Sequence, residues 1–157
     1  MRTEAEILDR ITSLTAANDW MGTQRGDLIA ALPFNTAMPY LTDKAVADGP
    51  EVWETGRVST DDKIKEAIRD YLPFAIGKAV DHRGLSAGRS IDHMVSWLWL
   101  LGDDELIADI DDEYRPYGAP ILAAIAAKYA PDADGIDGAE FQRMATKGSC
   151  SEDCWDC

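Results

Sequence analysis

The chain has 157 residues, of which 46% are hydrophobic, and its 29 Asp and Glu outnumber its 15 Lys and Arg to give a formal net charge of −14. This length suits one domain that buries roughly 70% of the surface of its unfolded chain. The apolar content excludes a chain disordered by its charge, and the negative field disfavours direct binding to nucleic acid or to an anionic membrane. The charge favours basic proteins, or proteins that bind DNA, as partners.

No apolar segment is long enough to predict a membrane span. The longest, 94–101, contains Ser96 and falls far short of the ~20 residues that a bilayer-crossing helix needs. Near the N-terminus, Glu4, Glu6 and Asp9 interrupt the apolar positions that a signal peptide requires. All 3 cysteines lie at the C-terminus, where they cannot staple a core. We therefore expect a protein of a reducing cytosol.

Helical signals begin at the N-terminus. Thr3 and Glu6 form a capping box ahead of apolar residues at helical spacing, which predicts a helix over 4–17. A second short helix is expected over 27–32, because Pro33 disfavours helix at the residue before it.

The segment 33–59 is rich in proline and glycine, which predicts turns or one short helix over 36–41, with Trp53 anchoring the loop on the core. Thr60 caps a helix that runs to Val80, and Pro73 should kink or split it.

The second half of the chain adds a central helix and several short ones. Ser90 is expected to cap a tryptophan-rich helix over 91–101, with too little polar surface to lie anywhere but in the core. Gly102 should end it. Short helices are then expected over 103–110, 120–130 and 138–145. The sequence predicts an all-α fold, with one compact domain of six or seven helices over 1–146 and a flexible tail over 147–157.

A basic, glycine-rich loop before the central helix is a candidate anion-binding site. Backbone N–H groups at a helix start, guanidinium groups and hydroxyls can together hold a phosphate or carboxylate. The residues that would do so are His82, Arg83, Ser86, Arg89 and Ser90. In the alternative interpretation the glycines turn the chain and the arginines pair with local carboxylates.

Catalysis is not the expected activity. The spacing of His82 and His93 from the nearby serines matches no nucleophile motif, and the position of His93 inside an apolar helix is typical of a hydrogen-bonded core histidine. We therefore assign no catalytic residue.

The cysteines Cys150, Cys154 and Cys157 have a spacing that can supply three zinc ligands, with a histidine or a second chain as the fourth. The alternative is a free tail. No other cofactor is indicated.

Carboxylates accumulate after the central helix. The whole segment 90–114 contains no Lys or Arg that could pair with them locally. Helical spacing puts Glu105, Asp109, Asp112 and Glu113 along one face, which is either a solvated surface or a partner-binding surface.

Several segments together resemble a family of small acidic proteins of actinobacterial phages. These segments are 24–29 (QRGDLI), 32–34 (LPF), 70–75 (DYLPFA), 83–90 (RGLSAGRS), 92–94 (DHM) and 97–104 (WLWLLGDD). The resemblance covers about 1–130 and assigns no site residues. It implies an accessory protein of the kind with which phages bind and inhibit host machinery, some by imitating the charge of DNA.

Two functions follow from these observations. The first is a non-enzymatic phage accessory protein in the host cytosol, which binds a host or phage protein through its acidic face. The alternative is an anion- or metal-binding protein that uses the 82–90 loop or the cysteine tail.

Overall fold

The computed structural model describes residues 1–17, 23–81, 85–113 and 119–132, with the backbone alone at 78–81, 85–90, 111–113 and 119–120. Within these ranges the protein is all-α, as predicted, and no strand is present. The described helices are α1 (Glu4–Ala16), α2 (Thr23–Ala30), α3 (Phe34–Ala37), the 3-10 helix η1 (Met38–Tyr40), α4 (Asp43–Gly56), α5 (Asp61–Asp81), α6 (Leu85–Leu101), α7 (Asp104–Glu113) and α8 (Ala119–Tyr129). None of them combines the length and apolarity needed to cross a membrane.

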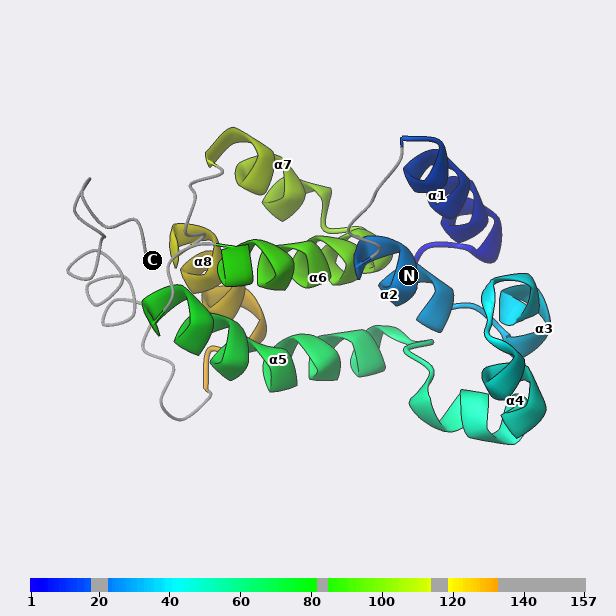
Figure 1. Ribbon diagram of the computed structural model, residues 1–157. Helices are drawn as coiled ribbons and strands as arrows, with labels where there is room; N and C mark the ends of the chain where they lie inside the picture. Colours follow the sequence, from blue (N-terminus) through cyan, green and yellow to red (C-terminus); the bar gives the residue numbers. More distant parts are fainter. Residues whose placement is uncertain (18–22, 82–84, 114–118, 133–157) are drawn as a thin grey trace.

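Helices α5 and α6 form an antiparallel pair along the length of the molecule (Figure 1). Helix α8 contacts α5, and α7 contacts both α6 and α8. Helices α1 to α4 gather at the end of the pair where α5 begins and α6 ends, with α2 in direct contact with α6. Helix α6 thus contacts elements from both halves of the chain.

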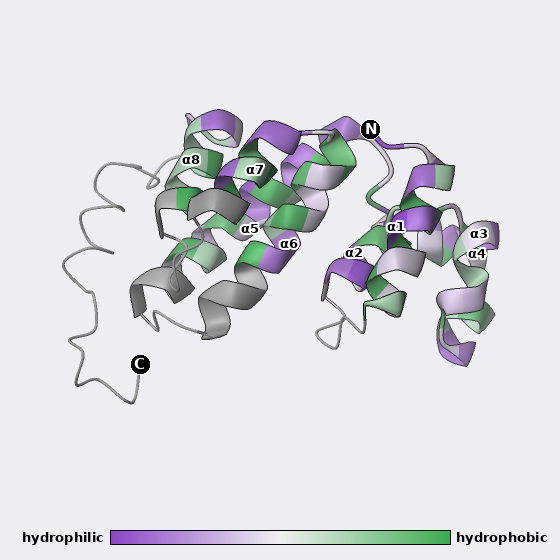
Figure 2. Ribbon diagram, turned by 90° about the horizontal axis from the view of Figure 1, so that it is seen from above, coloured by the Kyte–Doolittle hydropathy of each residue, from purple (hydrophilic) through white to green (hydrophobic). Residues whose placement is uncertain are grey.

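The hydrophobic core lies between these helices. Hydrophobic and hydrophilic residues alternate along each helix in Figure 2, as expected of helices with one buried side. The fully buried side chains include Ile64, Ile68 and Leu72 of α5, Met94, Leu98 and Leu100 of α6, and Leu122 and Ile125 of α8. The core also takes Ile7 and Ile11 of α1 and Leu28 of α2, so it joins the two ends of the molecule.

Helix boundaries that depend on local capping chemistry agree with the sequence. The Thr3 side chain accepts from the Glu6 backbone N–H, and the Glu6 carboxylate accepts from the Thr3 N–H at 2.7 Å, which completes the predicted capping box. Thr60 caps α5 by accepting from the Lys63 N–H at 3.2 Å. Gly102 has φ +79°, which a glycine adopts readily at the end of a helix such as α6.

The segment 33–59 is more helical than predicted. It contains α3, η1 and α4, which raises the number of described α-helices above the six or seven expected. The sequence did not predict helix α4, because Gly49 and Pro50 within it are typical of a turn. Gly49 indeed leaves the helical conformation (φ 84°, ψ 177°), so α4 consists of two short helical pieces joined at a kink. The prediction for Trp53 is confirmed, since its indole N–H donates to the Leu32 carbonyl at 2.9 Å and the ring packs on the core.

Two helix starts differ from the prediction, and of the two outcomes expected at Pro73, a kink or a split, the split does not occur. Helix α2 begins at Thr23 and not at Asp27. Helix α5 continues through Pro73 without splitting, although proline removes one backbone hydrogen-bond donor. Helix α6 begins at Leu85, so Ser90 lies inside the helix and does not cap it. Helix-compatible residues ahead of the apolar run extend α6, and one internal glycine costs only about 1 kcal/mol.

We expect Leu98→Ala to lower the free energy of unfolding by roughly 2–5 kcal/mol, because truncating the fully buried Leu98 leaves a cavity in the hydrophobic core. Val52→Ala, at a side chain that is 59% exposed, should change it by less than about 0.5 kcal/mol. Urea unfolding followed by circular dichroism measures both. Similar small losses for the two variants would mean that α6 is not a core helix.

Candidate protein-interaction surface

The turn between α6 and α7 fixes the start of the acidic segment. The Gly102 N–H donates to the Trp99 carbonyl at 3.0 Å and the Asp103 N–H donates to the Leu98 carbonyl at 2.9 Å, the pair of bonds that defines a Schellman motif. Asp103 then caps α7, because its carboxylate accepts from the Leu106 N–H at 3.2 Å. Gly102 therefore ends α6 and Asp103 begins α7, as the sequence predicted.

The same Asp103 carboxylate also joins α7 to α8. Its second oxygen accepts from the Lys128 ammonium at 2.6 Å and from the Tyr129 hydroxyl at 2.5 Å, while only 6% of the side chain is exposed. Burial raises the Asp103 pKa, but the hydrogen bonds from Lys128, Tyr129 and Leu106 outweigh it and leave the pKa below its ordinary value. Burial and the hydrogen bond to Asp103 raise the pKa of Tyr129. The carboxylate is thus held ionised and the phenol neutral.

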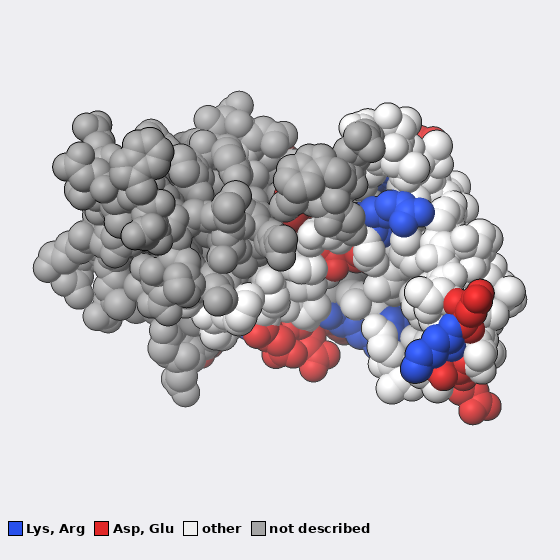
Figure 3. Space-filling view, in the orientation of Figure 1, with Lys and Arg blue, Asp and Glu red and all other residues white. Residues whose placement is uncertain are grey.

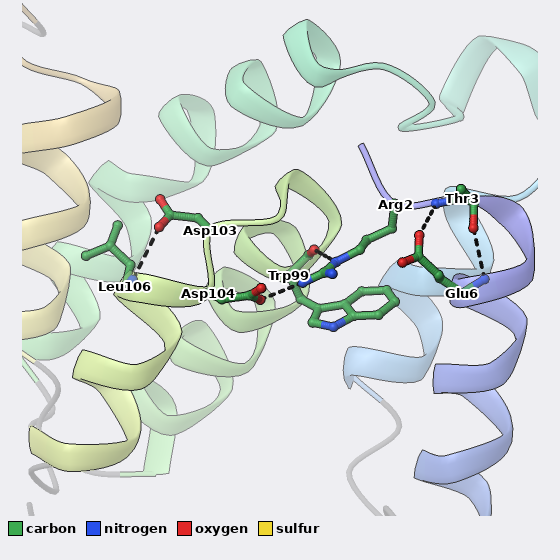
Figure 4. A network of polar contacts seen from close by, with 7 residues as sticks. All are labelled: Arg2, Thr3, Glu6, Trp99, Asp103, Asp104 and Leu106. Atoms are coloured by element: carbon green, nitrogen blue, oxygen red, sulfur yellow. Dashed lines mark hydrogen bonds and ion pairs between the residues drawn. The ribbon is translucent and has the colours of Figure 1, made fainter.

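The N-terminal segment contacts the turn from the opposite side. Arg2 donates from Nε to the Trp99 carbonyl at 2.9 Å and from its terminal nitrogen to Asp104 at 2.5 Å (Figure 4). Its guanidinium carbon lies 4.9 Å from the centroid of the Trp99 ring, within cation–π range. The backbone N–H of Arg2 donates to Leu100 at 2.8 Å. These contacts hold the N-terminus against the first residues of α7.

Two shallow grooves flank the start of α7. The first, with a volume of about 360 Å³, lies between α7 and α8 and is lined by Glu105, Asp109 and Leu106 on one side and by Ala124, Ala127 and Lys128 on the other. The second, of about 480 Å³, lies toward the start of α5, where Asp61 and Lys65 line it. Asp103, Glu105 and Lys128 line both grooves, so the two grooves adjoin at the start of α7.

The carboxylates that line these grooves differ in whether they are already paired. Asp61 lies 3.1 Å from the N-terminal ammonium, Asp104 is bound by Arg2, and Asp103 is bound by Lys128. Glu105 and Asp109 are exposed, and their side chains make no ion pair or hydrogen bond with any residue of the described ranges. We call this pair, one helical turn apart on α7, the α7 acidic face. Among the described residues, no cation pairs with this charge.

The predicted acidic face also included Asp112 and Glu113. Both residues belong to α7, so the helical spacing that groups them with Glu105 and Asp109 is kept. Their side chains lie outside the described residues, as do those of the predicted anion site.

The anion-binding prediction is corrected in one respect. Ser86, Arg89 and Ser90 lie within α6 and not in a loop before it. His82 and Arg83 fall outside the described residues. The metal prediction also lies outside them, because it rests on Cys150, Cys154 and Cys157. Within the described part of the chain, no group of three or more His, Cys, Asp and Glu side chains is arranged to hold a metal ion.

The sequence did not predict the partly buried ion pair between Asp27 of α2 and His93 of α6. His93 Nδ1 lies 2.7 Å from an Asp27 carboxylate oxygen, and the ring stacks on Trp97 and meets the edge of Tyr71. The structure confirms His93 as a hydrogen-bonded histidine packed on the core, although 30% of its side chain is exposed. No signal in the sequence connects Asp27 with His93, because they are far apart along the chain.

The hydrogen bond to Asp27 raises the His93 pKa above its ordinary value; burial opposes this shift, while the charges of Asp27 and Asp92 support it. Folding therefore makes protonation of His93 more favourable than it is in the unfolded chain, and the imidazolium form links α2 to α6.

Comparison with protein-family models, curated proteins and solved structures gives no match. The site is therefore interpreted from its own geometry.

We expect Asp103→Ala to lower the free energy of unfolding by roughly 1–3 kcal/mol, because it removes the α7 cap and leaves the Tyr129 hydroxyl without its acceptor. Asp104→Ala, at a carboxylate whose side chain is 68% exposed, should cost less than about 1 kcal/mol. Chemical denaturation of both variants makes the comparison. Equal losses would show that Asp103 does not anchor the α6–α7 turn.

The unfolding free energy should fall as the pH rises past about 6.5, the ordinary histidine pKa, and through the higher pKa of folded His93. The folded state binds the proton more tightly than the unfolded chain, so the stabilisation is complete below the unfolded pKa and lost above the folded one.

Asp27→Asn removes the charge that raises this pKa and should flatten the dependence, whereas His82→Gln should keep it. Denaturation at a series of pH values between about 5.5 and 8.5 covers the window. An unchanged slope in Asp27→Asn would contradict the assignment to His93.

Proposed function

We propose that the protein is a non-enzymatic phage accessory protein that binds a basic or DNA-binding protein of its bacterial host or of the phage through the α7 acidic face. The observation that carries the proposal is the pairing state of the groove carboxylates. Asp61, Asp103 and Asp104 are paired with cations of the same chain, whereas Glu105 and Asp109 are exposed and unpaired within the described residues. Negative charge of this kind attracts Lys and Arg of a partner.

The groove between α7 and α8 suits long cationic side chains. Leu106, Ala124 and Ala127 provide an apolar wall, and Glu105 and Asp109 provide carboxylates beside it. A lysine or arginine can lay its aliphatic stem along such a wall while its charged group meets the carboxylates. This combination distinguishes the groove from a merely solvated helix face.

The rigidity of α7 favours recognition over non-specific attraction. Asp103 fixes the first turn of the helix, and Leu106 and Ile110 bury its inner side. Carboxylates on a fixed helix lose less freedom on binding than carboxylates on a loop. Binding to the surface with which a host protein holds DNA would block that surface, and inhibition would then follow from occupancy alone.

The test is the combined variant Glu105→Gln, Asp109→Asn and Asp112→Asn. We expect it to fold normally, because exposed carboxylates repel one another and their removal is harmless or mildly stabilising. Its association with the partner captured from an actinobacterial lysate should be slower, and the remaining affinity should depend less on salt. Surface plasmon resonance at several ionic strengths measures both effects.

A matched control removes the same charge from α5 with Asp62→Asn, Glu66→Gln and Asp70→Asn, all exposed positions. It should keep most of the wild-type association rate. Wild-type kinetics and an unchanged salt slope in the α7 variant would refute the proposal. Equal losses in the two variants would assign the attraction to net charge and not to this face.

A further inference from the structure

Residues of α2 and α4, together with Arg57, line a small apolar pocket. Helix α4 lies at the end of the molecule away from α8 (Figure 1). The volume of the pocket is about 150 Å³, and Ala30, Ala45, Val52, Trp53 and Gly56 form most of its lining. An apolar cavity of roughly this volume accepts a molecule the size of benzene, so a leucine or phenylalanine side chain fits.

Helix α4 presents this pocket on an unusually exposed surface. The helix contributes no fully buried residue, and Val52 is 59% exposed at the edge of the pocket. Trp53 is fixed in the wall by its indole hydrogen bond to Leu32 at 2.9 Å. A rigid aromatic beside exposed aliphatic groups is the composition that anchors partner side chains at interfaces.

The negative charge around the pocket favours a partner segment that carries basic residues. Helix α4 carries Asp43, Asp48, Glu51 and Glu54, all exposed, against the single cation Lys44. Figure 3 shows carboxylates over the α3–α4 end of the molecule, with few cations among them. Asp48 itself lines the pocket, and its pair with Lys44 at 3.1 Å is exposed and therefore weak. An apolar side chain flanked by basic residues complements this arrangement.

Arg57 forms a polar part of the pocket wall, and its guanidinium group makes only long hydrogen bonds. Its terminal nitrogens lie 3.3 Å from the Ala31 carbonyl and 3.5 Å from Glu54, and its buried Nε–H has no acceptor among the described residues. An unsatisfied buried donor is costly, so a rotation of the side chain toward an added acceptor is favoured. A peptide carbonyl supplies such an acceptor.

We propose that this pocket binds the apolar anchor side chain of a short basic segment of a partner protein, with Arg57 donating to a carbonyl of that segment. The proposal rests on the protein-binding function above and adds a second contact, at α4, that recognises sequence where the α7 acidic face recognises charge.

The probe is a synthetic acetylated heptapeptide amide of six lysines around a central leucine, titrated into the full chain while the indole N–H of Trp53 and the Nε–H of Arg57 are followed by NMR. We expect saturable shifts of both signals. The same peptide with a central alanine should bind about tenfold more weakly, because it leaves the pocket unfilled. A peptide with glutamate in place of lysine should not bind.

Two variants block the pocket in different ways. Val52→Asp places a charge at its exposed edge, and Ala45→Leu fills it with apolar atoms. Either should abolish the leucine preference, whereas Ala47→Asp, on the exposed side of α4 and outside the pocket lining, should retain it.

Equal affinity for the leucine and alanine peptides would refute the proposed binding at the pocket. An indole N–H resonance of Trp53 that does not shift would refute it as well. Binding that survives Val52→Asp but is lost in the combined α7 variant would also overturn it, and would leave the α7 acidic face as the binding site. If only the pocket variants lose the preference for the leucine peptide, the pocket is supported. This result does not depend on how the combined α7 variant binds the captured partner.

Discussion

The buried carboxylate of Asp103 is the interaction on which the arrangement of the second half of the molecule depends. Taking an ionised carboxylate out of water costs several kcal/mol unless hydrogen bonds replace the lost hydration. Three donors do so here, from the backbone of Leu106 and from the side chains of Lys128 and Tyr129. Because these donors belong to α7 and α8 and the acceptor follows α6, satisfying one charge sets the position of three helices.

Much of the fold can be predicted from the sequence, because it is set by local chemistry. The Thr3 capping box, the Thr60 cap and the Gly102–Asp103 turn involve residues within a few positions of one another, and each was expected. Helix α4 was not, because Gly49 and Pro50 indicate a turn, while the structure uses them as a kink between two helical pieces. The start of α6 was misplaced because a serine ahead of an apolar run predicts a cap equally well when the helix has already begun.

The candidate site was predictable only in part. Helical spacing places Glu105 and Asp109 on one exposed side of α7. Sequence cannot tell which carboxylates the chain neutralises itself, since Arg2 and Lys128 reach Asp104 and Asp103 from distant positions. The Asp27–His93 pair and the pocket beside Trp53 are likewise products of tertiary packing. These long-range contacts separate the carboxylates that stabilise the fold from those that a partner can use.

The two proposed surfaces differ in what they contribute to binding. Exposed charge on α7 steers a basic partner and raises its association rate, while an apolar anchor beside Trp53 slows its dissociation. Neither surface requires a change in the core, since the residues involved are exposed or line open grooves.

The most direct measurement of the proposed partner binding is site-specific photo-crosslinking in a lysate of the proposed actinobacterial host. A crosslinking residue is placed at Ala108, exposed on α7 beside the acidic face, and separately at Ser13, exposed on α1. The account predicts one crosslinked basic protein from position 108 that fades with added salt, and no such product from position 13. The same product from both positions, or a partner that crosslinks only at position 13, would contradict it.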